Sequence, residues 1–309
     1  MQRAVIISAA LVGARELITE LGGDPAALAL AAGVPERAFD APDLFVDAGC
    51  VVDFLELAAR ECGREDFGLL HARRLPLGVL GQGWMLMRAA DTVGAALRDF
   101  ADLYGLYTDA GSLRSDPHAD GSWLDYTFLP VGRWPPRQIV LLTLGCICLF
   151  VAARLGRPWR PARAELMVRP AHSRSFVEFF GPGLHFGAAR DAVWMDRDTL
   201  SAQADASRGR QLVHRALARE TVRPAAAVVQ VKALLGTLLR HDGGSIETVC
   251  AAMRVTPRTL QRRLTAAGTR FRVLQDEVRA EAALRHVQGS DLNFGQVADL
   301  LGYDSQAAF

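Results

Sequence analysis

Apolar and polar residues repeat with different periods along the chain, and these periods predict its elements. Residues 91–107 have an apolar face with the three-and-four spacing of an amphipathic helix, formed by Val93, Leu97, Phe100, Leu103 and Tyr104. Residues 112–117 and 122–129 predict the two strands of a hairpin, with the sequence DPHADG as its turn. The N-terminal segment, up to Cys62, predicts short helices separated by turn-forming stretches such as GGDP.

A long apolar segment follows the hairpin. It comprises 15 residues, 139–153, between Arg137 and Arg154, whereas a helix that crosses a bilayer needs about 20 residues. The sequence therefore predicts a buried helix over 136–155. Three further elements follow: a strand at 164–170, a short helix at 173–180 and one or two strands across 184–195. Together these elements indicate an α+β domain over residues 1–200.

The last third of the chain predicts helices only. Residues 201–224 are polar and contain several arginines, which is typical of a linker, and residues 225–309 predict an all-helical domain. Within that domain, the sequence TPRTLQRRLTAAGTRFR predicts a helix with Thr256 as its N-cap and Pro257 at its first position.

Two leucines define the core-facing side of this helix. Leu260 and Leu264 lie four residues apart, which is about 400° of rotation, so they share one face. Arg258 and Arg262 then point away from the core, Thr259 and Arg263 lie toward one flank, and Gln261 lies nearer the other. Such a stripe suits a DNA major groove, because Arg reads guanine and Gln reads adenine through paired hydrogen bonds. Arginines also keep helix faces solvated, so the stripe alone leaves both interpretations open.

The residues before this helix favour the DNA-binding interpretation. The sequence SIETVCAAM predicts a short helix with Ser245 as its cap and with Ile246, Val249 and Met253 on one face. A helix, a tight turn and a basic helix together form a helix-turn-helix.

The same apolar spacing occurs twice. Phe294, Val297 and Leu301 repeat the spacing of the apolar positions in the first short helix, and Phe309 repeats Leu260 with one additional residue in between. A second helix-turn-helix is therefore predicted to begin at Asn293, with one extra residue in its turn. Residues 271–288 predict a connecting helix of about 27 Å, comparable with the roughly 34 Å between successive major-groove faces of B-DNA.

Charge is divided unevenly along the chain. The formal net charge is only +1, yet residues 208–309 hold 15 Lys and Arg against 9 Asp and Glu, which leaves −5 for residues 1–207. No acidic residue lies between Glu247 and Asp276, where six arginines occur: Arg254, Arg258, Arg262, Arg263, Arg270 and Arg272. A basic domain beside an acidic one is expected to attract a polyanion.

Other candidate chemistry is sparse. Five scattered cysteines fit a reduced cytoplasm, and Cys146 and Cys148 lie in the apolar segment, which favours core packing. Asp116, His118 and Asp120 alternate as a metal site could, but their place in the predicted turn favours turn chemistry. We therefore predict no metal and no cofactor. The aromatic residues Trp84, Trp123, Tyr104 and Tyr107 fit either an effector pocket or the core, and the core is the preferred interpretation.

Several stretches together resemble a known family. RTLQRRL, GTRF, DEVRAEAAL and VADLLGYDSQAAF resemble, in order and spacing, the tandem helix-turn-helix domain of AraC/XylS transcription regulators, over about residues 225–309. LGGDPAALALAAGVPERAF, FGLLHAR and FFGPGLHFGAARDAVWM are similar to the arabinose-binding-domain-like effector domain of one branch of that family.

The resemblance implies a cytoplasmic transcription regulator, an activator, with a sensing and dimerisation domain at 1–200 and a DNA-binding domain at 225–309. Its implied partners are double-stranded promoter or operator DNA, an apolar or amphipathic small-molecule effector, a second copy of the chain and RNA polymerase, with no membrane. Base reading by the first recognition helix would fall on Arg258, Gln261 and Arg262. In the second motif, Ser305, Gln306 and Ala307 would begin the recognition helix.

The sequence departs from the family pattern at two places. Arg254 stands where the family has a glycine in the turn, and a positive φ there would cost arginine of order 1 kcal/mol. The sequence also stops at Phe309, inside the second recognition helix, so we expect this polypeptide to bind DNA weakly and through one head.

Two other classes remain as alternatives. The N-terminal region could be an enzyme with the helical tail as an accessory, or the tail could bind a protein such as polymerase. An enzyme is not expected, because residues 1–200 contain no visible nucleophile, acid and base constellation.

Overall fold

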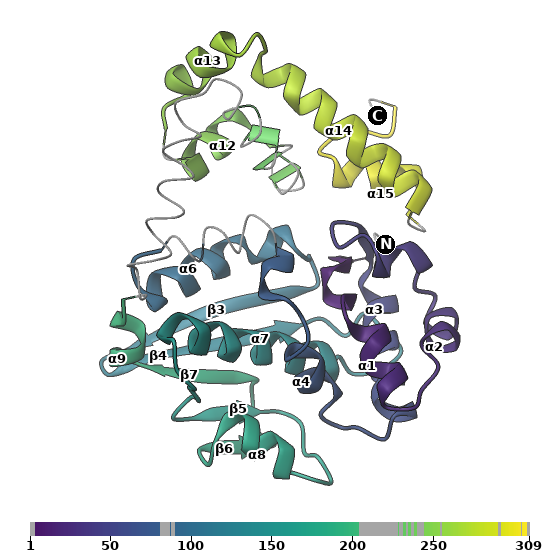
Figure 1. The fold of residues 1–309 in the computed structure, drawn as a ribbon, viewed down its shortest axis with the longest axis vertical. Helices are drawn as coiled ribbons and strands as arrows, with labels where there is room; N and C mark the ends of the chain where they lie inside the picture. The colour runs from purple at the N-terminus through teal and green to yellow at the C-terminus, as the bar shows by residue number, and fades with distance from the viewer. Residues whose placement is uncertain are drawn as a thin grey trace. The chain divides into compact units, whose positions relative to one another are not determined.

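The computed structural model describes residues 4–80, 87, 90–203, 228, 231, 232, 234, 235, 238, 239, 244–253, 255–289, 292–303 and 305–307 (Figure 1). The chain divides into two compact units, Arg3–Asp205 and Ala206–Phe309. The first unit mixes helices and strands, and the described part of the second is helical.

A five-stranded sheet organises the first unit, in the order β3-β4-β7-β5-β6. Its strands are β3 (Gly111–His118), β4 (Gly121–Phe128), β5 (Ala164–Leu166), β6 (Leu184–Phe186) and β7 (Ala192–Asp196). Neighbours are antiparallel except for β5 and β6, which are parallel. All five strands overlap segments that the sequence predicted as strands or as the hairpin.

The remaining elements of the first unit are helices and one small sheet. The α-helices are α1 (Ala14–Glu20), α2 (Pro25–Ala32), α3 (Ala48–Glu61), α4 (Phe67–Ala72), α6 (Val93–Leu103), α7 (Arg137–Leu155), α8 (Arg174–Phe180) and α9 (Arg197–Ser201). Short 3-10 helices are η1 (Ser8–Leu11), η2 (Glu36–Phe39), η3 (Leu77–Leu80) and η4 (Tyr104–Leu106). Strands β1 (Val5–Ile7) and β2 (Phe45–Asp47) pair antiparallel and were not predicted, because such short strands do not display an alternating period.

The hairpin differs from its prediction at the turn. Its ladder continues to the pair His118–Gly121, so only Ala119 and Asp120 form the loop, whereas the sequence predicted a longer turn over DPHADG. Asp116 and His118 therefore lie in β3, with His118 Nε2 3.3 Å from Asp116 Oδ2. A proline can stand beside them because β3 is the outermost strand, where a missing N–H leaves no partner strand unsatisfied. Among the described residues, no three His, Cys, Asp or Glu side chains gather as a metal site.

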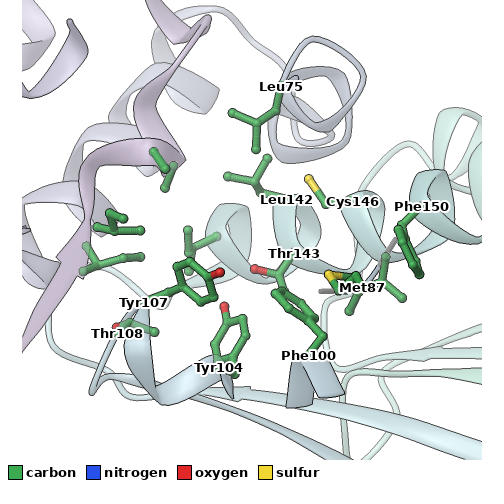
Figure 2. Close-up of a pocket in the computed structure, with 16 residues that line it drawn as sticks. Leu75, Met87, Phe100, Tyr104, Tyr107, Thr108, Leu142, Thr143, Cys146 and Phe150 are labelled. Atoms are coloured by element: carbon green, nitrogen blue, oxygen red, sulfur yellow. The ribbon is translucent and has the colours of Figure 1, made fainter. Parts of the chain in front are cut away.

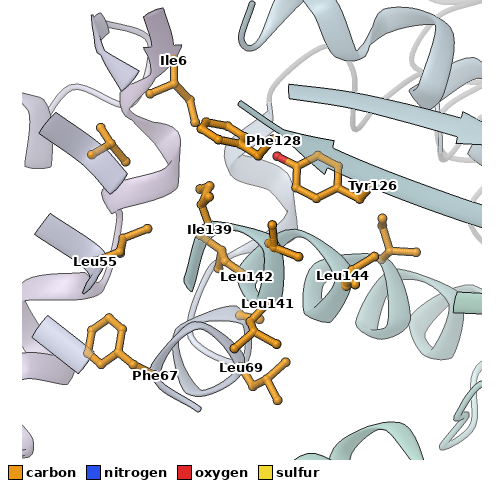
Figure 3. Packing of buried hydrophobic residues seen from close by; sticks show 14 of the residues in the cluster. Ile6, Leu55, Phe67, Leu69, Tyr126, Phe128, Ile139, Leu141, Leu142 and Leu144 are labelled. Atoms are coloured by element: carbon orange, nitrogen blue, oxygen red, sulfur yellow. The ribbon is translucent and has the colours of Figure 1, made fainter. Parts of the chain in front are cut away.

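Helix α7 is the centre of the first unit's core. Figure 3 shows Leu141 and Leu144 of α7 between α4 and the aromatic side chains of β4. A Cβ atom at Gly68 of α4 would overlap the carbonyl oxygen of Gln138, so only glycine allows this approach. Among the described helices, α7 alone is long and apolar enough to cross a membrane, but most of it is buried in the fold, as the sequence predicted.

Buried polar groups fix where α7 begins. The Glu56 carboxylate of α3 accepts the backbone N–H of Gln138 at 2.6 Å. The Gln138 side chain in turn accepts the N–H of Gly68 at 2.8 Å and donates to the carbonyl of Glu65 at 3.0 Å. Burial raises the pKa of Glu56 to about 7, although the neighbouring arginines act in the opposite direction.

His71 of α4 is a second buried polar group. Its Nε2 lies 2.9 Å from the carbonyl oxygen of Val12 and donates to it, so Nδ1 carries no proton. Nδ1 is buried and has no hydrogen-bond partner among the described residues. Burial lowers the pKa of His71 to about 4, and the imidazole is therefore neutral in the folded protein at neutral pH.

The second unit contains four helices within 244–307. They are α12 (Ile246–Met253), α13 (Pro257–Ala266), α14 (Phe271–Gly289) and α15 (Phe294–Leu300). Each begins at or next to the position that the sequence predicted. Most of the predicted linker, from residue 204 on, lies outside the described residues, and Gln203 still forms a β-bridge with Thr92 of the first unit.

Candidate functional site

Helix α13 is held by a cap at its start and by two leucines beneath it. The Thr256 hydroxyl accepts the backbone N–H of Thr259 at 3.3 Å, and Pro257 follows at the first helical position. Leu260 and Leu264 are fully buried. Their burial fixes which side chains of α13 face outward.

The outward face of α13 is basic. Arg258, Gln261 and Arg262 are exposed, and Thr259 and Arg263 are half-buried at its flanks. Among the described residues, neither Arg258 nor Arg262 has an acidic side chain within ion-pair distance. Two guanidinium groups and one amide therefore point into solvent from the same helix, in the arrangement predicted from the leucine spacing.

Helices α12 and α15 begin with equivalent caps. Ser245 accepts the N–H of Thr248 at 3.1 Å, and at the matching position of the repeat Asn293 accepts the N–H of Gln296 at 3.0 Å. The second cap is reciprocal, because the Gln296 side chain accepts the N–H of Asn293 at 3.0 Å.

The two helices also end alike. The N–H of Val255 donates to the carbonyl of Cys250 at 3.0 Å, and the matching N–H of Tyr303 donates to the carbonyl of Ala298 at the same distance. Between the latter pair lies Gly302, whose φ of 71° is left-handed and favours glycine. Its equivalent in the first copy is Arg254, which lies outside the described residues. The repeat in the sequence is thus a repeat of backbone geometry.

Helix α14 contacts the segments on either side of it. Near its start, the Gln275 side chain donates to the carbonyl of Gly244, just before α12, at 3.1 Å. Farther along, Arg279 Nε donates to the carbonyl of Leu301, after α15, at 3.1 Å, and its guanidinium lies 5.1 Å from the Tyr303 ring. With 19 residues, α14 is about 28 Å long.

The predicted site residues after α15 are exposed but not helical. Ser305 lies in a bend and Gln306 in a turn, where the sequence predicted the beginning of a helix.

The first unit contains an apolar pocket beside α7 (Figure 2). Its empty volume, including the part open to solvent, is about 720 Å³. It is lined by Ile6, Ile7, Ala9, Ala10, Leu75, Met87, Phe100, Tyr104, Tyr107, Thr108, Ile139, Leu142, Thr143, Cys146, Ile147 and Phe150. The part that can hold the centre of a water-sized sphere is about 80 Å³, so the pocket can admit only a compact ligand.

Of the four aromatic residues considered from the sequence, Tyr104 and Tyr107 line this pocket. Trp123 does not, because it packs against Trp194 with a centroid separation of 5.3 Å. Trp84 lies outside the described residues. Cys146 and Cys148 pack in the first unit's core as predicted, but the Cys146 thiol also faces the pocket, and burial raises its pKa to about 12.

The pocket was not predicted as a site. The signal that could have indicated it lies in α7, where Thr143 and Cys146 interrupt an apolar helix at helical spacing, on the face that also presents Ile139, Ile147 and Phe150. Polar residues on one face of an otherwise apolar helix indicate a second environment there, either a hydrogen-bond partner or a cavity.

Comparison with known proteins identifies the family. Residues 22–204, more than half of the chain, match the model of the arabinose-binding N-terminal domain of AraC transcription regulators. The chain belongs to the AraC family of transcription regulators. This AraC-type regulator is 27% identical to the HTH-type transcriptional regulator VirS of Mycobacterium tuberculosis, over 96% of this chain and 89% of that protein.

Two further relatives come from Pseudomonas aeruginosa. The ornithine utilization regulator is 25% identical, over 95% of this chain and 88% of its own length. The crystal structure of the transcriptional regulator CdpR is 22% identical, covers 78% of this chain and 80% of its own, and has a TM-score of 0.42, too low to carry an argument. The family resemblance predicted from the sequence is confirmed, and these relatives are regulators rather than enzymes.

Proposed function

We propose that this AraC-type regulator binds double-stranded DNA through a tandem helix-turn-helix in its second unit. The observation that carries the proposal is the face of α13, where Arg258, Gln261 and Arg262 are exposed above two fully buried leucines. Arg258 and Arg262 would read guanine, Gln261 would read adenine, and Thr259 and Arg263 would contact the flanking backbone.

The repeat of caps and closing hydrogen bonds supports a second, equivalent motif at α15. Each motif would offer one short helix followed by a turn toward a reading segment, Thr256–Ala266 in the first and the residues from Ser305 in the second. Helix α14, hydrogen-bonded near both motifs, would keep them at a fixed separation of the order of one DNA turn.

Effector control forms the other half of the proposal. The pocket of the first unit would hold a small molecule whose binding changes the affinity of the second unit for its operator. We also propose that the chain activates transcription, forms a homodimer and contacts RNA polymerase, and only its membership of the family supports these three parts. Reporter transcription and sedimentation with and without DNA measure them.

The test begins with selection of preferred duplexes from a random library, followed by fluorescence anisotropy titrations. The affinities for the selected duplex and for a scrambled duplex of equal length and composition are measured between about 50 and 200 mM salt. Over this range the affinity falls more steeply with salt when the protein neutralises more phosphates. We expect sequence-dependent affinity that falls with salt. Binding that depends on duplex length but not on sequence would refute the proposal.

A further inference from the structure

Helix α6 forms one wall of the pocket in the first unit. Phe100 and Tyr104, at the end of this helix, line the pocket, and their rings meet edge to face with centroids 5.4 Å apart. The free space beside them is small, since the part that can hold the centre of a water-sized sphere is about 80 Å³. A ligand that exceeds this space has to displace a wall of the pocket.

Of the two helices that border the pocket, α6 is the one that can move at lower cost. Arg98 and Asp102, on the side of α6 that faces away from the core, are exposed. Helix α7 is buried along most of its length, and the Glu56 carboxylate holds its start. A helix that is packed on one side is displaced more easily than a helix surrounded by close-packed side chains.

The start of α6 holds the backbone where the chain leaves the first unit. The N–H of Val93 donates to the carbonyl of Ala202 at 3.1 Å, and Thr92 forms a β-bridge with Gln203. Ala202 and Gln203 are the last described residues before the second unit, which follows from residue 206. From Val93 to Phe100 the helix rises by about 10 Å, so one short helix connects the pocket with this segment.

The interface between α6 and α9 leaves no free space to absorb a displacement. A Cβ atom at Gly94 would lie 3.0 Å from the carbonyl oxygen of Leu200, so the two backbones are in close contact. Helix α9 is also held from another side, because the Trp159 indole donates to the Thr199 hydroxyl at 3.1 Å. A shift of α6 therefore acts on the hydrogen bond that joins α6 to Ala202.

We propose that α6 transmits the occupancy of the pocket to the start of the linker. An occupant displaces the rings of Phe100 and Tyr104, and α6 shifts as one body. The hydrogen bond between Val93 and Ala202 then opens, which changes how the second unit is tethered and thereby its affinity for DNA. This inference rests on the proposed effector control and names the element that carries it.

Val93→Pro removes the donor of this hydrogen bond and preserves the start of the helix. Val93 is the first residue of α6, a position at which proline is favoured. Thr92 before it has φ of −128° and ψ of 163°, the extended conformation that a following proline requires. Val93→Ala is the matched control, because it also removes the branched side chain but keeps the N–H.

Cys146→Phe serves as the occupant, since its side chain enters the pocket from α7 (Figure 2). Ala153→Phe adds the same side chain at an exposed position of α7 and is its control. Fluorescence anisotropy on the full chain measures the affinity for the selected duplex. We expect Cys146→Phe and Val93→Pro to change this affinity in the same direction, each by at least about fivefold, and their double variant to lie within about twofold of either. Both controls should stay within about twofold of wild type.

Hydrogen exchange tests the link without DNA. Cys146→Phe should accelerate the exchange of the Val93 amide by at least about fivefold relative to wild type and to Ala153→Phe, because the bond to Ala202 opens. Where Val93→Pro or Cys146→Phe lacks the native circular dichroism spectrum, Gly94→Ala, which inserts a methyl group against Leu200, or Cys146→Met takes its place with the same expected results.

The outcomes separate this inference from the proposed function. An effect of Cys146→Phe on DNA affinity that persists undiminished in the Val93→Pro background would overturn the link through α6 and leave effector control standing. Unchanged exchange at Val93, or a Val93→Ala effect equal to that of Val93→Pro, would overturn the link as well. Accelerated exchange with unchanged affinity for the selected duplex would support the link within the first unit and refute effector control of DNA binding.

Discussion

Two buried titratable groups of the first unit should change the free energy of unfolding with pH in opposite directions. Replacing one group should reveal the pH dependence that the other causes. Burial raises the pKa of Glu56 from 4.5 to about 7 and lowers that of His71 from 6.5 to about 4. The perturbations are Glu56→Gln, which keeps an acceptor for the N–H of Gln138, and His71→Gln, whose amide can still donate to Val12.

The sign for each group follows from which state binds the proton. Between pH 4.5 and about 7, folded Glu56 keeps a proton that the unfolded chain has lost, so rising pH favours unfolding. Between about pH 4 and 6.5, the unfolded chain holds a proton on His71 that the folded protein lacks, so rising pH favours folding. At about 1.4 kcal/mol per pKa unit, each effect amounts to about 3 kcal/mol, and the two nearly cancel between pH 4.5 and 6.5.

Urea unfolding followed by tryptophan fluorescence measures this directly. All five tryptophans, Trp84, Trp123, Trp134, Trp159 and Trp194, precede residue 205, so the signal reports the first unit alone. We expect the free energy of unfolding of Glu56→Gln to rise by about 2 kcal/mol from pH 4.5 to 6.5 relative to wild type, and that of His71→Gln to fall by a similar amount.

The double variant is the control, because contributions from all other groups are common to the four proteins and cancel in the comparison. Its difference from wild type should stay nearly constant across this range. A Glu56→Gln profile parallel to that of wild type would show that the folded protein does not hold the proton on Glu56, and the reasoning from burial would be wrong.

Three further predictions concern the second unit. Arg262→Ala should weaken binding to the selected duplex by about 1–3 kcal/mol and relax specificity at one base pair in anisotropy titrations. Arg174→Ala, on the first unit, is the control and should leave binding unchanged. An equal loss of affinity on every duplex would indicate that Arg262 contacts phosphate only. Leu264→Ala should lower the free energy of unfolding of the second unit by about 2–5 kcal/mol, measured by urea and far-UV circular dichroism, and exposed Thr265→Ala should change it by under about 0.5 kcal/mol. Asn293→Ala should cost about 1 kcal/mol in the same assay, and an unchanged midpoint would show that the cap of α15 does not stabilise it.

The sequence predicted most accurately those helices in which a strong apolar period coincides with residues that mark the ends of the helix. For α13, Thr256, Pro257 and two leucines determine its start and its buried face, and the exposed arginines follow from these. For α7, a long apolar run could only be a buried or membrane helix, and its length favoured burial. The base-reading roles of Arg258, Gln261 and Arg262 stay predictions, since exposure alone does not assign a contact.

The remainder depends on contacts that no local pattern encodes. The pairing of β1 with β2 joins segments that α1 and α2 separate along the chain, and the extension of β3 through Pro117 depends on its place as the outermost strand. The pocket requires residues from near the N-terminus, α6 and α7 to meet without filling the space between them. Side-chain packing determines whether such a cavity forms, and the periodicity of the sequence does not reveal it.

The outer border of the main sheet has a consequence for self-association. Along β3 the residues from Arg114 to His118 are exposed, and they include a cation, an anion and a proline. An incoming strand of another copy would find a missing donor at Pro117 and would bury charge beside it, so continuous β-addition there is disfavoured. Stacking of copies into fibrils through the β3 edge is opposed by the same residues.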